Sequence, residues 1–143
     1  MRAAAVLVTL LLLSGCGGAV QMEPPVPEGT AVEACTRLAP LLPQELDGAG
    51  RTASTPESPY VTVWGEGEIA LRCGVPRPAR MAPTDRLDEI GGVGWFTDPD
   101  RPTLFTAVTD LAYVEVTVAA TRVAPEVLAD LSRPIAQATA QAG

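Results

Sequence analysis

A hairpin pattern that carries a cysteine constrains the fold of this chain more than any other stretch. Residues 60–78 read YVTVWGEGEIALRCGVPRP, with two alternating runs on either side of a glycine-bearing turn. Successive side chains of an extended chain point to opposite faces, and glycine tolerates the positive φ of a tight reversal. A Gly-x-Gly pair also occurs in phosphate-binding turns, but that fingerprint needs a third glycine and a following helix. The stretch therefore predicts a β-hairpin.

The alternation assigns the hairpin side chains to two faces. One face of the return strand holds Ile69, Leu71, Cys73 and Val75. We expect Cys73 to lie in the core and Arg72 to point away from it. Trp64, in the first strand, has two interpretations: on the outer face it would stack with Arg72 and form a candidate binding surface. Alternatively it fills the core, which needs bulk because aromatic residues are only 4% of the chain.

The N-terminus resembles an export signal. Residues 3–13 are apolar apart from Thr9, but they are too few to span the roughly 30 Å hydrocarbon core of a membrane as a helix. The next residues complete Leu13-Ser14-Gly15-Cys16, which matches the lipobox of bacterial lipoproteins position by position. The match implies that residues 1–15 are a lipoprotein signal peptide. It also implies that Cys16 carries acyl chains such as palmitate, which anchor the protein to the outer face of the cytoplasmic membrane. A buried N-terminal element with a chance cysteine is the alternative.

Two cysteines remain once Cys16 is assigned to lipid. A capping box, Thr30-Ala-Val-Glu33, predicts the start of a helix, and the apolar stripe that follows contains Cys35. Cys35 and Cys73 thus both occupy core-facing positions in a compartment where disulfides persist, which predicts a bond between them. Two unrelated buried thiols are the alternative. Residues 16–29 are rich in proline and show no apolar period, so we expect an extended tether there.

Further strands and a second helix complete the expected single domain, residues 30–143. Alternating apolar runs predict strands at 93–97, 104–108 and 112–119. Pro125 fits the first turn of a helix that Pro134 should break or kink. Residues 84–90 are expected to form one or two helical turns, and residues 44–59 an exposed connection. The expected fold is α+β, with about five strands in a largely antiparallel sheet, N- and C-terminal helices packed on one face, and one disulfide.

The composition argues against several classes of function. The chain has a formal net charge of −7 and contains no Lys, His or Asn, which argues against a nucleic-acid partner. Without His and Lys, the usual neutral-pH bases and histidine metal sites are absent, and we expect no metal and no cofactor. Hydrolysis would depend on carboxylates, with Glu66 and Glu68, or Asp98 and Asp100, as candidate pairs. Both pairs fall in predicted turns, where ordinary solvated residues are the simpler interpretation.

Several segments together resemble one known family. WGEGEIALRCGVPRP, the later GVGWF and AYVEVTV, and the lipobox start are similar to a family of predicted actinobacterial exported lipoproteins, known as domain of unknown function 3515. The resemblance covers roughly residues 30–135. Its specific core is carried by Trp64, Gly65, Ile69, Leu71, Arg72, Cys73, Gly74 and Val75. It implies a cell-envelope protein and supplies no catalytic residues.

Two functions follow as hypotheses. The first is a membrane-anchored envelope lipoprotein that acts as a non-enzymatic binding or assembly module. Its partner would be an envelope protein, a cell-wall component or a small ligand, bound through the face that holds Trp64 and Arg72. The alternative is a carboxylate-dependent hydrolase that acts on envelope glycans.

Overall fold

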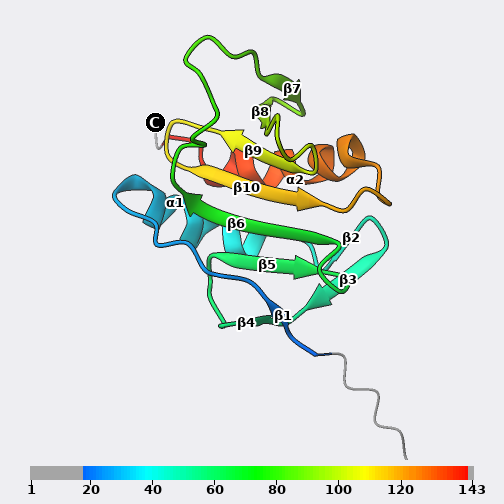
Figure 1. The fold of residues 1–143 in the computed structure, drawn as a ribbon. Coiled ribbons are helices and arrows are strands. Elements are labelled where there is room, and N and C mark those ends of the chain that lie inside the picture. The colour runs from blue at the N-terminus through cyan, green and yellow to red at the C-terminus, as the bar shows by residue number, and fades with distance from the viewer. Residues whose placement is uncertain (1–17, 142–143) are drawn as a thin grey trace, which may run out of the picture.

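The fold is a large antiparallel sheet with two helices behind it (Figure 1), and a computed structural model describes residues 18–141. The sheet has eight strands in the order β2-β3-β5-β6-β10-β9-β8-β7. In that order their bounds are Glu45–Leu46, Ala49–Thr52, Val61–Trp64, Ile69–Val75, Tyr113–Val118, Leu104–Val108, Val93–Thr97 and Asp88–Ile90. All neighbouring pairs in this sheet are antiparallel. The expected α+β class, large antiparallel sheet and hairpin are therefore confirmed.

The expected number of strands, about five, is wrong because three short strands lie at the two edges of the sheet. β2 and β3 lie within residues 44–59, which we expected to be an exposed connection, and β7 replaces the helical turns expected at residues 84–90. These strands have two to four residues and little apolar alternation. Short polar edge strands are common because they limit pairing with other chains, and the same polarity hides them in a sequence.

The helices also differ from the expectation in detail. α1 spans Thr30–Leu38 and continues as a 3₁₀ turn, η1, over Ala39–Leu41. The capping box does not form, because the Thr30 hydroxyl donates to the carbonyl of Leu111 at 3.0 Å and Glu33 pairs with Arg37 at 2.7 Å.

α2 spans Ala124–Ala138 and runs through Pro134, which we expected to break or kink it. Buried residues lie on both sides of this proline, with Leu131 before it and Ile135 and Ala138 after it. Packing of that stripe offsets the roughly 3 kcal/mol that proline costs inside a helix.

The main core lies between the helices and the inner face of the sheet. It joins side chains of α1 and α2 to inner-face residues of β5, β6 and β10. The Cys35–Cys73 disulfide crosses this core from α1 to β6, with the two Cα atoms 5.6 Å apart, as predicted. The helix ends are joined as well, since Arg37 Nε donates to the carbonyl of Ala138 at 3.0 Å.

The outer face of the sheet is covered by an irregular segment that we call the strap, residues 20–28. Its first part, β1 (Val20–Gln21), pairs in parallel with β4 (Ser54–Thr55). Val20 and Met22 then pack over a small second cluster formed by Val61, Val63 and Ala70. Figure 1 shows this blue segment running from β1 past β5 to the start of α1. The described part of the predicted tether, residues 18–29, is therefore largely packed on the domain.

A second irregular segment, residues 76–87, connects β6 to β7 across the other half of the sheet. Met81 is buried within it, and Leu87 lies so close to Gly94 that a Cβ there would be 2.8 Å from its methyl group. No helix among residues 18–141 is both long and apolar enough to cross a membrane. Cys16 lies outside the described residues.

Candidate functional site

The structure does not bring Trp64 and Arg72 together, so the predicted two-residue surface is wrong. Trp64 is 0% exposed and lies in the core on the inner face, where its Nε1 donates to the carbonyl of Pro43 at 3.0 Å. Arg72 lies on the outer face, as expected from the alternation. The physical reason is the hairpin register, which pairs Trp64 with Ile69 and Val61 with Arg72, so each pair shares one face.

Arg72 fastens the strap to the sheet. Its Nε donates to the carbonyl of Glu23 at 3.0 Å, and its Nη1 lies 2.9 Å from Oε1 of Glu115, the residue opposite it on β10. Both side chains of this ion pair are partly buried. Arg72 is thus committed to holding two segments together.

Gly74 forms a β-bulge that receives the strap. The register between β6 and β10 shifts at this point, and Gly74 has φ +89°. A Cβ at Gly74 would lie only 2.4 Å from Cβ of Pro27. The bulge also moves Val75 to the face of its partner Tyr113, whereas simple alternation placed Val75 beside Cys73.

The first candidate carboxylate pair is divided, and only Glu68 lies in an ion network. Arg122 contacts Glu68 at 2.7 Å and Asp47 at 3.1 Å. The hydrogen bonds that the Arg122 guanidinium donates to Glu68 and then to Asp47 raise its pKa, so it stays charged. Glu66, by contrast, is exposed in the hairpin turn.

In the second pair, Asp98 caps a turn and Asp100 forms an ion pair. One oxygen of Asp98 accepts hydrogen bonds from the amides of Asp100 and Arg101, at 2.9 and 3.0 Å. Asp100 itself pairs with Arg80 at 2.9 Å. Within residues 18–141, no group of three or more His, Cys, Asp or Glu residues could hold a metal ion.

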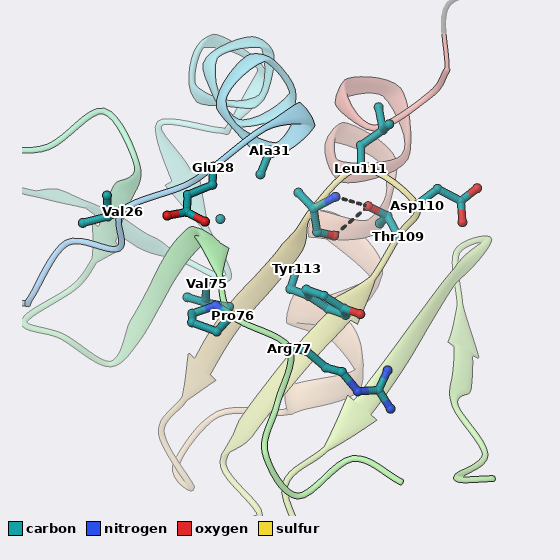
Figure 2. A pocket seen from close by; sticks show the side chains of 12 residues that line it. Val26, Glu28, Ala31, Val75, Pro76, Arg77, Thr109, Asp110, Leu111 and Tyr113 are labelled. Atoms are coloured by element: carbon teal, nitrogen blue, oxygen red, sulfur yellow. Dashed lines mark hydrogen bonds between the residues drawn. The ribbon is translucent and has the colours of Figure 1, made fainter. Parts of the chain in front are cut away.

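Concave surface occurs instead at the end of β6, in a space of about 450 Å³ that we call the strap hollow (Figure 2). Three segments distant in sequence form its walls: the strap with Val26 and Glu28, the chain after the bulge, and the turn between β9 and β10. Figure 2 shows Glu28 on one side of the hollow, and Tyr113 and Asp110 on the other.

Local hydrogen bonds fix the turn that forms the far wall. The Thr109 hydroxyl donates to the carbonyl of Ala112 at 2.7 Å and accepts from its amide at 3.1 Å, as the dashed lines in Figure 2 show. Thr30, at the start of α1, holds the carbonyl of Leu111. The wall is therefore preformed and tied to the first helix.

A second space of about 260 Å³, the arginine hollow, adjoins the first and shares Val75, Pro76 and Arg77 with it. Its charged lining residues are Arg72, Arg77, Arg80, Arg101, Asp98 and Glu115. Arg77 Nη2 donates to the carbonyl of Met81 at 2.9 Å, and Arg77 has no carboxylate partner among the described residues. Two adjacent hollows thus meet at one arginine.

Sequence reasoning missed Glu28, Arg77 and Tyr113. Glu28 falls in the segment expected to be a tether, and Arg77 lies between two prolines at the end of the hairpin stretch, where the alternation stops. One signal was present: glycine inside a strand marks a bulge or a close approach of another backbone, and Gly74 does both. It did not reveal which segment approaches.

Together these features define a disulfide-linked α+β domain with a preformed, ligand-sized hollow on its strapped face. The chain matches the family described as "Protein of unknown function (DUF3515)" over residues 3–143. It belongs to that family. No curated protein and no solved structure gives a significant match to the chain.

Proposed function

We propose that the protein is an exported lipoprotein, anchored through Cys16 to the outer face of the cytoplasmic membrane, which binds an envelope component without catalytic turnover. The lipobox residues 13–16 support the anchor. The Cys35–Cys73 bond supports an oxidising location outside the cytoplasm, because disulfides rarely persist inside it.

The strap hollow is the observation that carries the binding role. Its volume of about 450 Å³ falls in the range of small-ligand pockets. Two hydrogen-bonded walls preform it, so little conformational entropy opposes binding. Glu28 and Arg77 line it and form no ion pair within residues 18–141.

The contacts of the candidate carboxylates favour binding over hydrolysis. Glu68, Asp98 and Asp100 are each held by an arginine or by backbone amides. A general acid and base pair needs two carboxyl groups that are free to exchange protons in different environments. We therefore prefer a binding module to a glycan hydrolase.

Filling the strap hollow tests this function. Val26 lines the hollow and is 85% exposed, so Val26→Trp should fill it without loss of fold. Val123, which is 56% exposed and precedes α2, provides the matched control, Val123→Trp. Full-length protein in nanodiscs is incubated with fractionated envelope fragments, and retained compounds are identified by mass spectrometry.

We expect the wild type and Val123→Trp to retain the same compound, and Val26→Trp to lose it. Equal retention by both variants would place the binding surface elsewhere. Retention of nothing by the wild type would contradict the binding role itself.

A further inference from the structure

The two hollows together have a charge asymmetry that selects a class of ligand. Two carboxylates, Glu28 and Asp110, line the strap hollow, and both are exposed without an ion pair inside the described part of the chain. The arginine hollow has four arginines against the two carboxylates of Asp98 and Glu115. Arg77 lines both hollows, so the combined surface has its unpaired carboxylates in the strap hollow and an excess of arginine from Arg77 into the arginine hollow.

The basic end has guanidinium groups available for a ligand. Arg77 has no carboxylate partner, and Arg101 approaches Asp98 only to 3.6 Å while its side chain is 68% exposed. A guanidinium binds a carboxylate through two parallel hydrogen bonds. The acidic end offers carboxylate oxygens that accept from an ammonium group.

The floor between the two ends is continuous. Tyr113 lines the strap hollow and Glu115 lines the arginine hollow, and they are two residues apart on the outer face of β10. That spacing is about 7 Å. Apolar surface from Val26, Val75 and Leu111 flanks this floor.

We infer that this surface binds a short peptide with a free amino group at the Glu28 end and a free carboxyl group at the Arg77 end. The inference rests on the proposed binding role of the strap hollow and names its ligand class. A short peptide suits this surface, because an extended chain of about three to four residues at roughly 3.3 Å each can span the floor from Tyr113 to Glu115. A phosphate-rich ligand fits poorly, because Glu28 and Asp110 repel it.

Blocked peptides test the two charges separately. The full-length lipidated chain in nanodiscs is titrated by calorimetry with alanine tetrapeptide in four forms: free, N-acetylated, C-amidated and blocked at both ends. We expect each block to weaken binding by about fivefold, the upper range for a solvent-accessible ion pair.

Charge-neutral variants then assign each end. Glu28→Gln should reduce the preference for a free amino group, because only Asp110 then remains as a carboxylate in the strap hollow, and leave the preference for a free carboxyl group. Arg77→Gln should do the reverse. Arg133→Gln, on the exposed side of α2, is the matched control and should change neither.

Each other outcome counts against the inference. If the doubly blocked peptide binds as tightly as the free one, or if both variants weaken all four peptides equally, the terminal charges are not recognised. If no tetrapeptide binds while the wild type still retains an envelope compound that Val26→Trp loses, the peptide class is wrong and the binding role stands.

Discussion

Gly74 shows how much of this fold depends on single positions of the outer face. Its φ of +89° is costly for any other residue, and Pro27 occupies the space where a Cβ would lie. The side chain of Arg72, two residues earlier, holds the strap through a hydrogen bond to the carbonyl of Glu23. Adjacent residues of the LRCGV run therefore hold segments on opposite faces of the sheet. Cys73 is bonded to α1 on the inner face, while Arg72 and Gly74 contact the strap on the outer face.

Gly74→Ala should destabilise the domain more than Gly92→Ala. Gly92 also has a positive φ, +80°, but a Cβ there would meet nothing within 4 Å. Backbone strain alone costs about 1–2 kcal/mol, and the contact with Pro27 should bring the total for Gly74→Ala to about 2–4 kcal/mol. Urea unfolding of both variants measures the difference, and equal free energies of unfolding would show that the strap moves freely.

At this scale the sequence predicted the disulfide but not the position of Trp64. Cys35 and Cys73 both lie on apolar stripes of fixed period, which orient them without ambiguity. Trp64 alternates with Val61 and Val63, and both sets are apolar because helices cover one face and the strap covers the other. The length of the turn, residues 65–68, predicts the face of Trp64 better than the alternation does, because a four-residue turn places Trp64 opposite Ile69.

At the scale of elements, strands with long alternation and helices with apolar stripes could be predicted, and segments held by tertiary contacts could not. The strap shows no recognisable period of apolar residues, because only two of its residues, Val20 and Met22, pack against the second cluster on the outer face. Its place depends on the hydrogen bond that the Arg72 side chain donates to the carbonyl of Glu23, and on the space above Gly74 that Pro27 occupies. A proline-rich composition predicts an extended conformation but not what it packs against.

The strap should contribute measurably to stability. Val20→Asp would place a charge against Val61 and Val63, and we expect a loss of about 1–3 kcal/mol in the free energy of unfolding. Gln21→Asp adds the same charge one residue later, where the side chain is exposed, and should change stability by less than about 0.5 kcal/mol. Thermal or urea unfolding distinguishes the two, and matching losses would contradict a packed strap.

At the scale of the whole molecule, the proposed anchor makes its own prediction. Cells fed an alkyne analogue of palmitate should label the wild-type protein and leave Cys16→Ala unlabelled. Acyl chains contribute about 0.8 kcal/mol per buried methylene, so the labelled protein should stay with the membrane fraction. A mature N-terminus at Met1, or an unmodified Cys16, would contradict the anchor.

The path of the strap has a mechanical consequence for a chain held at its N-terminus. Tension would peel β1 from β4 first, then reach the bond between Glu23 and Arg72, and then unwind the start of α1. Extension ends at Cys35, because its covalent bond passes the load to β6, which β5 and β10 hold on both sides. The released length from residue 18 is at most about 60 Å. The same pull would remove Val26 and Glu28 from their wall, so release of the proposed ligand would be coupled to mechanical load while the sheet remains folded.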